Sequence, residues 1–223
     1  MSYRMDDKII SINRKKLHKI SSDSTGDVYC YRNQALKLFK QGEKPPIEEE
    51  TARYLTGIST SRVLLPKNLV FSNNAFKGFT YKLVNKPTNP ERLIQIERKQ
   101  LVEEISVIER DIEILSNKNV LLSGIDPKNA IHSHELYLSA PDQFSILDLY
   151  SNRELELLNK YQLHLLMTAL LISDLRKSRI SKRKEETIKE LLSMKEESDH
   201  TSEFLEDLMS SCENFEQFVK KIK

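Results

Sequence analysis

The alternation of hydrophobic and polar residues indicates a β-rich segment over positions 1–85. The runs "DVYCYR" (27–32) and "QALKLFK" (34–40), separated by Asn33, predict a hairpin. A second hairpin is predicted within 62–84, where the polar turn "SNN" separates two apolar strands. Between the hairpins, residues 45–58 have prolines at their start, acidic residues in the first turn and apolar residues at helical spacing, which predicts a helix.

The pattern after residue 90 is mainly helical. Thr88 and Glu91 form a capping-box pair, and the Leu and Ile residues that follow recur every three to four positions, which predicts one long amphipathic helix over 90–116. Two short β-like pieces follow at 135–139 and 144–150. Four further helix-like segments run to the end of the chain, at 154–178, 182–197, 201–212 and 214–222.

The proline-rich segment "NKPTNP" (85–90) divides these two patterns. It predicts a division of the chain into a sheet-forming part, 1–86, and a mostly helical part, 87–223. The fold class expected is therefore α+β, because the strands and the helices are segregated along the chain rather than alternating.

Composition narrows the function classes. With 39% hydrophobic residues, 30% charged residues and a net charge of +2, the chain has the composition of a globular protein, and the small charge argues against nucleic acid as its main partner. Cys30 and Cys212 are too few for a disulfide framework, which favours a reducing cytoplasm. The charged start "MSYRMDDKII" and the lack of an 18-residue apolar run predict no export and no membrane span, as suits a bacterial cytoplasm.

Candidate chemistry begins at "ISSDSTGDVY" (20–29), which "ALKLFK" follows at 35–40. This pair of segments resembles the protein kinase-like superfamily, in which a G-x-G-x-x-G-x-V loop precedes a strand that carries A-x-K. Without gaps, Ser21, Asp23 and Gly26 fall on the three glycine positions and Val28 falls on the valine. A carboxylate at Asp23 would repel a triphosphate unless it faces away or holds a metal. A plain hairpin with polar turns is the alternative for this segment.

The resemblance places Ala35 and Lys37 on the A-x-K pair, and it implies that Lys37 holds the α- and β-phosphates of ATP and pairs with a glutamate of the following helix. The acidic trio 48–50 offers that glutamate, and Glu50 is preferred because it lies deepest in the predicted helix. A solvent-facing strand lysine and a helix start that is simply acidic are the alternatives. The resemblance also implies that Leu83 and Val84 belong to the hinge that meets adenine.

A second group of motifs lies in the segment "SGIDPKNAI" (123–131) and in "FSILDLY" (144–150). The first resembles the catalytic loop R-D-L-K-P-E-N-I-L, and it implies Asn129 as a metal ligand. The second resembles the strand that ends in D-F-G, and it implies Asp148 as the partner ligand for Mg²⁺. Gly124 stands where the catalytic base is expected, so an active enzyme would have to use Asp126. The alternative is a simple turn at 126–129 and a helix-capping role for Asp148.

Taken in order along 18–150, these features imply a two-lobed kinase-like fold with a small antiparallel-sheet lobe and a short helical lobe. Only 75 residues follow Asp148 and they contain no A-P-E, so the resemblance is to compact atypical members of the superfamily such as the RIO kinases. It implies ATP and Mg²⁺ as cofactors. Whether the protein is an enzyme is left open: it is either a slow phosphotransferase or a nucleotide-binding pseudokinase that acts through a protein partner.

A function of another class is a helical adaptor that binds proteins without nucleotide. Two weaker candidates also stand in the sequence. His132 and His134 would share one face of a strand, but they lack a third metal ligand nearby. The basic run 176–184 is either a phosphate contact or a solvated junction between helices.

Overall fold

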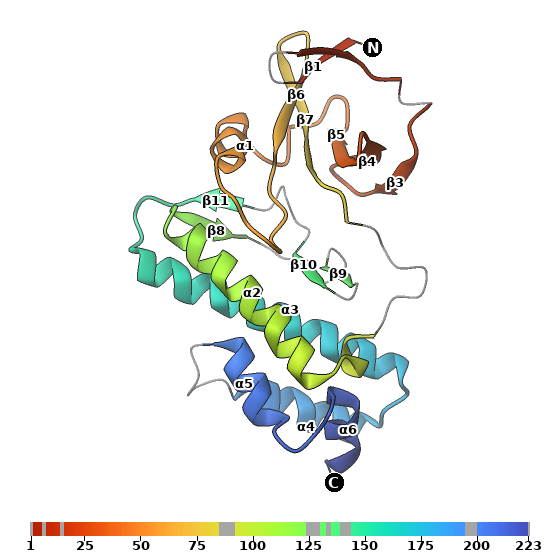
Figure 1. The fold of residues 1–223 in the computed structure, drawn as a ribbon, viewed down its shortest axis with the longest axis vertical. Helices are drawn as coiled ribbons and strands as arrows, with labels where there is room; N and C mark the ends of the chain where they lie inside the picture. The colour runs from red at the N-terminus through yellow and green to blue at the C-terminus, as the bar shows by residue number, and fades with distance from the viewer. Residues whose placement is uncertain are drawn as a thin grey trace. The chain divides into compact units, whose positions relative to one another are not determined.

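The computed structural model describes residues 2–5, 8–13, 16–84, 92–123, 130–132, 135–138, 144–194 and 200–222 (Figure 1). The described chain combines an antiparallel sheet with helices, so the predicted α+β class is confirmed. It divides into two compact units. The sheet unit contains Met1–Thr60, Leu64–Asn85 and Ala140–Ile146, and the helical unit contains Ser61–Val63, Lys86–Ser139 and Leu147–Lys223.

Seven antiparallel strands and one helix form most of the described part of the sheet unit. In chain order they are β1 (Ser2–Met5), β2 (Lys8–Ser11), β3 (Lys19–Ser22), β4 (Gly26–Tyr31), β5 (Gln34–Phe39), α1 (Glu49–Thr56), β6 (Asn68–Ser72) and β7 (Ala75–Lys82). Their spatial order is β2-β1-β6-β7-β5-β4-β3. The short strand β11 (Phe144–Ile146) also belongs to this unit. Helix α1 begins at Glu49, later than the predicted start at residue 45, and it follows β5 directly in the chain.

The two predicted hairpins are confirmed. β4 and β5 are joined by Arg32 and Asn33, with φ of 46° and 61°, and β6 and β7 are joined by Asn73 and Asn74, with φ of 50° and 60°. Two successive residues with positive φ are typical of the tight turns whose twist matches that of a hairpin, and asparagine tolerates this region well. The short turns fix the register of the strands on either side.

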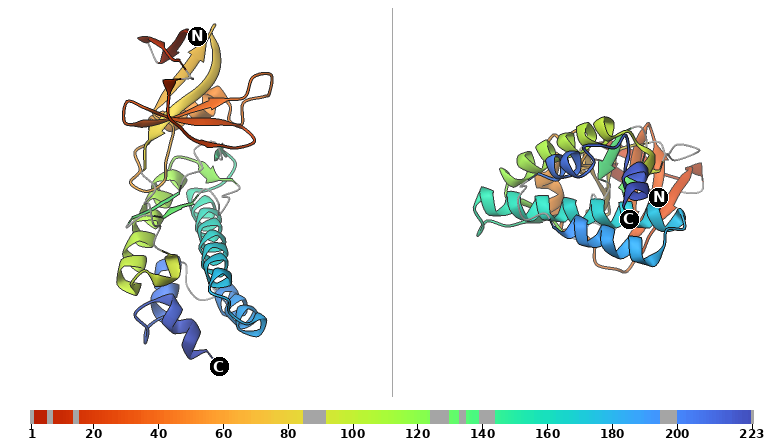
Figure 2. Two further views of the ribbon diagram at one scale, coloured as in Figure 1. Left: turned by 90° about the vertical axis from the view of Figure 1, so that its right-hand side faces the viewer. Right: turned by 90° about the horizontal axis from the view of Figure 1, so that it is seen from below.

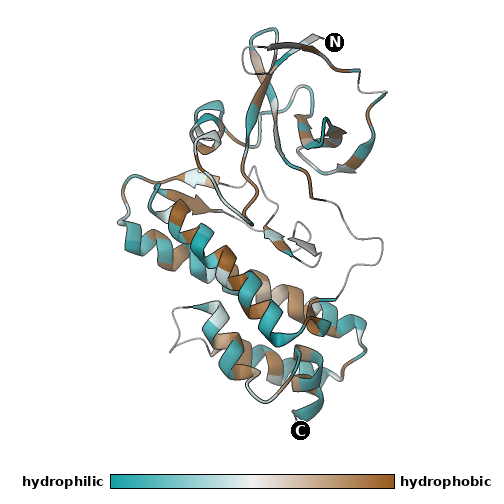
Figure 3. Cartoon of the chain, in the orientation of Figure 1, coloured by the Kyte–Doolittle hydropathy of each residue, from teal (hydrophilic) through white to brown (hydrophobic). Residues whose placement is uncertain are grey.

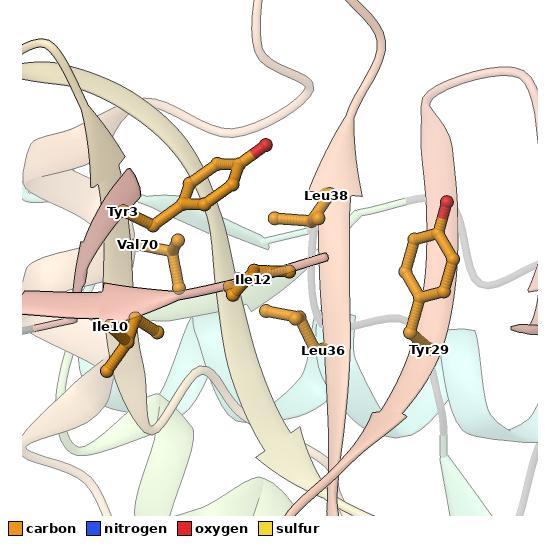
Figure 4. Packing of buried hydrophobic residues seen from close by; sticks show 7 residues of the cluster. All are labelled: Tyr3, Ile10, Ile12, Tyr29, Leu36, Leu38 and Val70. Carbon is orange, nitrogen blue, oxygen red and sulfur yellow. The ribbon is translucent and has the colours of Figure 1, made fainter. Parts of the chain in front are cut away.

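The N-terminal strands β1 and β2 extend the sheet beyond β6, and the sequence pattern did not predict them. Ile12 lies over Leu36 and Leu38 of β5, and Ile10 lies nearer to Val70 of β6 (Figure 4). The buried cluster on one face of the sheet consists of Tyr3, Ile10, Ile12, Tyr29, Leu36, Leu38 and Val70. Because successive side chains of a strand point to opposite faces, Lys37 belongs to the other face of the sheet.

Five α-helices and four short elements form the described part of the helical unit. They are η2 (Leu93–Gln95), α2 (Arg98–Ser116), β8 (Val120–Leu122), β9 (Ala130–His132), β10 (Leu136–Leu138), α3 (Asn152–Lys177), α4 (Lys182–Ser193), α5 (Thr201–Leu208) and α6 (Phe215–Lys221). Helix α2 packs against α3 and α5 (Figures 1 and 2). β9 and β10 pair antiparallel, with Ala130 opposite Leu138.

Helix α2 is amphipathic, as the sequence predicts. Hydrophobic and hydrophilic residues alternate along it (Figure 3). The apolar side chains at three-to-four-residue spacing are buried, namely Leu101, Ile105, Ile108, Ile112 and Leu115. The burial of this stripe explains why the periodicity was informative.

The predicted start of this helix at residue 90 is wrong, because α2 begins at Arg98. Leu93 and Ile94 are fully buried in the short turn η2 instead. The backbone N–H of Leu93 donates to the carboxylate of Asp174 at 2.9 Å, which fixes this turn against α3. A tertiary hydrogen bond and burial therefore override the local helical pattern. The Thr88–Glu91 capping pair lies outside the described residues.

Buried polar side chains tie loops of the helical unit to its helices. The carboxylate of Asp111, which is 2% exposed, accepts hydrogen bonds from the backbone N–H groups of residues 61–63 at 2.6–3.0 Å. Asn159 of α3 accepts from the N–H of Leu122 at 2.7 Å and donates to the carbonyl of Val120 at 2.9 Å. Each of these buried groups satisfies backbone atoms that secondary structure leaves unpaired.

Candidate functional site

A buried lysine on an interior strand of the sheet is the most unusual chemical feature of the sheet unit. Lys37 lies on β5, directly opposite Val28 on β4 and Phe79 on β7, and it is 4% exposed. Lysine is rarely buried without a partner, because removing its charge from water is costly. The ammonium group therefore requires a nearby anion.

Asp23 supplies that anion from the turn between β3 and β4. Lys37 Nζ lies 3.0 Å from Asp23 Oδ2, and the two side chains are 5% and 46% exposed. The two residues are fourteen positions apart and belong to the same unit. Their ion pair joins the segment that resembles a glycine-rich loop to the strand that carries the A-x-K lysine.

The second carboxylate oxygen of Asp23 organises the turn itself. Asp23 Oδ1 accepts hydrogen bonds from the backbone N–H of Thr25 at 2.8 Å, from Thr25 Oγ1 at 2.7 Å and from the backbone N–H of Gly26 at 2.8 Å. The N–H of Asp23 donates to the carbonyl of Gly26 at 3.0 Å. An aspartate that binds the backbone two and three residues ahead is a common way to build a turn. Both oxygens of Asp23 are therefore engaged.

These contacts determine the ionisation of Asp23. Partial burial by itself would raise the pKa of the carboxyl group, but the hydrogen bonds from Thr25 and Lys37 and the charge of Lys37 together lower its pKa below the usual value. Asp23 is thus an ionised acceptor at neutral pH. The two opposite charges leave the immediate surroundings of Lys37 close to neutral.

Gly26 allows the turn to close against β5. A Cβ at this position would lie 2.5 Å from the carbonyl oxygen of Leu38, which is too close for any side chain. The one glycine that the loop shares with the glycine-rich pattern is therefore explained by the approach of two backbones. Ser21, on the first glycine position, is exposed on β3 and pairs in register with Val28.

The other residues predicted to hold the nucleotide lie in different surroundings. Val28 and Ala35 are 6% and 3% exposed, and they share the sheet face of Lys37, since Val28 is opposite Lys37 and Ala35 is two positions before it. Leu83 and Val84 follow β7 and are half-buried. The contact of Leu83 and Val84 with adenine stays a prediction.

Glu50 is exposed in the first turn of α1. Its neighbours Glu49 and Glu48 form ion pairs with Arg53 at 2.7 Å and with Lys44 at 3.7 Å. The pairing of Glu50 with Lys37 stays a prediction. The partner of Lys37 described above, Asp23, entered the sequence reasoning only as a group that repels phosphate.

Asp148 lies in an exposed turn after β11 rather than within a strand. Asn119 Nδ2 donates to Asp148 Oδ1 at 3.4 Å, and the N–H of Leu147 donates to the carbonyl of Asn119 at 2.9 Å. Asp148 is therefore held beside the residue that precedes β8. The helix after it is capped by Ser151 with Glu154 in a capping box, so the alternative capping role of Asp148 is wrong.

The remaining residues of the predicted catalytic group cannot be compared with Asp148. Asp126 and Asn129 lie outside the described residues, so the base and the metal pair stay predictions. The part of the chain that the structure describes contains no group of three or more His, Cys, Asp or Glu side chains that could together hold a metal ion.

The basic run 176–184 is engaged in contacts within the helical unit. Arg176 pairs with Glu185 at 2.5 Å and Lys177 with Asp174 at 3.0 Å. Hydrogen bonds from Arg176 and Lys189 lower the pKa of Glu185 to about 2. These contacts favour the solvated helix junction over a phosphate contact.

Comparisons with known proteins do not assign this chain to a family. No helix in the described ranges is long and apolar enough to cross a membrane. Neither the known protein families nor the curated proteins include a match to this chain.

Proposed function

We propose that this protein is a kinase-like protein that binds ATP and Mg²⁺ and acts as a pseudokinase. The buried Lys37 is the observation that carries the proposal. It lies on the third of the five strands β3–β7, after a turn that contains Gly26, and helix α1 follows directly. Protein kinases hold the ATP phosphates with a lysine on the third strand of their sheet, and the next helix carries the glutamate partner.

Several residues of the sheet unit have the chemistry that a nucleotide-binding site requires. Lys37 would hold the phosphates as a charged donor, and the apolar Val28 and Ala35 on the same face would pack against the base. Leu83 and Val84 would offer backbone groups at the hinge. Bound ATP would supply a transferable phosphoryl group, and Mg²⁺ would neutralise its charge.

The resemblance gives Asp148 and Asn129 as the two ligands that would hold Mg²⁺. Carboxylate and amide oxygens are the hard ligands that this ion prefers beside substrate phosphates.

One departure favours a binding function over catalysis. Gly124 stands at the position of the base. A base contributes about 10²–10⁴-fold to a proton transfer, so its loss slows turnover without preventing nucleotide binding. In the alternative form of this proposal, the protein is an enzyme that transfers phosphoryl groups slowly, with Asp126 as the base. In the pseudokinase form, the helical unit would bind a protein partner and the protein would act through that partner.

Thermal unfolding with nucleotide tests the proposal. A ligand that binds the native state raises the melting temperature, so millimolar MgATP should stabilise the wild-type protein. A phosphoryl-transfer assay with radiolabelled ATP then separates the enzyme from the pseudokinase. Asp126→Asn is expected to lose turnover only if Asp126 serves as the base. An unchanged melting temperature at millimolar MgATP would rule out both the enzyme and the nucleotide-binding pseudokinase.

A helical adaptor is the second candidate function, and the surface of α3 supports it. Leu157, Tyr161 and Leu165 recur at four-residue intervals on one face of α3 and are 48%, 55% and 44% exposed. An exposed apolar ridge of this kind is typical of a protein contact. The adaptor function predicts no thermal shift with nucleotide, and it predicts that Leu165→Glu abolishes partner binding while the melting temperature stays unchanged.

A further inference from the structure

The Asp23 carboxylate is held in place by its own turn, independently of Lys37. Three donors from Thr25 and Gly26 converge on Oδ1, so Oδ2 is presented to Lys37 by a turn that is already closed. The lysine is the more deeply buried partner, at 5% against 46% side-chain exposure. Asp23 thus behaves as a fixed anionic ligand of a buried cation.

A carboxylate and a phosphate make the same kind of contact with an ammonium group. Both accept charge-assisted hydrogen bonds through anionic oxygens, and Lys37 has a limited number of donors in a confined space. Asp23 also occupies a position of the glycine-rich pattern where the resembling loop would carry no side chain. An incoming phosphate and Asp23 therefore compete for the same cation.

We propose that Asp23 is an internal competitor of the nucleotide phosphates and sets the affinity of the site for phosphate-bearing ligands. The inference rests on the proposed function. In the resting protein Asp23 neutralises Lys37, so the site exerts little attraction on a phosphate. When a phosphate displaces Asp23 from Lys37, the freed carboxylate lies close to the phosphate and repels it. Both effects weaken the binding of nucleotides, and neither acts on a nucleoside that lacks phosphate.

Asp23→Asn separates the competing role from the structural one. The asparagine side chain keeps an oxygen that accepts from Thr25 and Gly26, so the turn is retained, while the amide that faces Lys37 carries no charge. Asp27→Asn is the matched control. Asp27→Asn removes the same charge from the same hairpin. Asp27, however, pairs with Lys19 at 2.7 Å and accepts a hydrogen bond from Ser22 at 2.7 Å.

Calorimetric titration of the full chain with MgADP and with adenosine tests the inference. Asp23→Asn should bind MgADP about tenfold to a hundredfold more tightly than the wild type, the range expected when one charge-assisted contact no longer has to be broken. Adenosine should bind all three proteins equally, and Asp27→Asn should match the wild type with both ligands. If Asp23→Asn unfolds at the assay temperature, Asp23→Ser, which can still accept within the turn, replaces it.

The possible outcomes distinguish this inference from the proposed function. Equal affinity of the wild type and Asp23→Asn for MgADP overturns the competitor role while nucleotide binding stands. A gain that is equally large for adenosine also overturns it, because loosening of the turn would then be the cause. If neither protein binds MgADP at millimolar concentration, the proposed function fails and the inference fails with it.

Discussion

Gly78→Ala should destabilise the sheet unit, because β7 passes very close to the strand that carries Lys37. A Cβ at position 78 would lie 2.0 Å from the carbonyl oxygen of Lys37. A carbon and a carbonyl oxygen normally approach to about 3.3 Å, so the strands would have to separate by about 1 Å. Overpacking of this kind costs about 2–3 kcal/mol.

Gly57→Ala is the matched control, since it adds the same methyl group within the same unit. Its Cβ would lie 3.5 Å from the carbonyl oxygen of Tyr54, an ordinary contact, and Gly57 has φ −83°, which alanine adopts readily. This change should be neutral or stabilise the protein by about 0.4–1 kcal/mol, because alanine restricts the unfolded chain.

Differential scanning calorimetry measures both effects and separates transitions if the two units unfold independently. For a unit of about 90 residues, such as the sheet unit, a loss of about 2–3 kcal/mol lowers the melting temperature by about 10–20 °C. Gly78→Ala should show this decrease and Gly57→Ala should not. A Gly78→Ala protein that melts within about 2 °C of the wild type would refute the close approach of β7 and β5 on which the position of Lys37 depends.

Three further predictions concern polar side chains. Asp111→Ala should destabilise the helical unit by about 3 kcal/mol or more in urea unfolding, because it leaves several buried N–H groups without an acceptor. Asp111→Asn, which keeps one acceptor oxygen, should lose less stability than Asp111→Ala. Hydrogen bonds from Lys19 and Ser22 lower the pKa of Asp27 to about 2, so its stabilising contribution is complete above its unfolded pKa of about 3.9 and is lost as the pH falls toward 2. Asp27→Asn should therefore flatten the loss of stability between pH 4 and pH 2, and an unchanged acid slope would contradict this. Asn159→Leu should lower the melting temperature of the helical unit, because it removes the contacts that hold β8.

The parts of the fold that were predictable from sequence are those that depend on neighbouring residues. The hairpin turns at 32–33 and 73–74 were recognisable because asparagine accepts positive φ, and helix α2 because its apolar residues share one face. The N-terminal strands were not recognisable. Arg4 of β1 pairs with Phe71 of β6, and such distant pairing leaves no local signal. The start of α2 failed for a related reason, since Asp174 holds the preceding turn.

The candidate site was predictable in the same uneven way. The apolar neighbours of Lys37 in the sequence indicated a half-buried strand lysine, and Lys37 is buried. Its pairing with Asp23 was not foreseen, although "DSTG" is a recognisable turn sequence, because the reach of the carboxylate to β5 depends on how the turn folds back. Asp148 was selected because "FSILDLY" resembles a strand that ends in D-F-G, and that criterion carries no information on which other residues lie nearby.

Binding of MgADP to the wild type, Lys37→Met and Lys40→Met proteins tests the central claim most directly. Lys40 follows β5 and is exposed, so its replacement removes the same charge without touching the buried site. In calorimetric titration the wild type and Lys40→Met should bind MgADP equally, and Lys37→Met should bind at least about tenfold more weakly, the loss expected for a charge-assisted contact to phosphate. Equal affinity of all three proteins, or no binding by the wild type at millimolar MgADP, would contradict the assignment of Lys37 as the phosphate-binding residue.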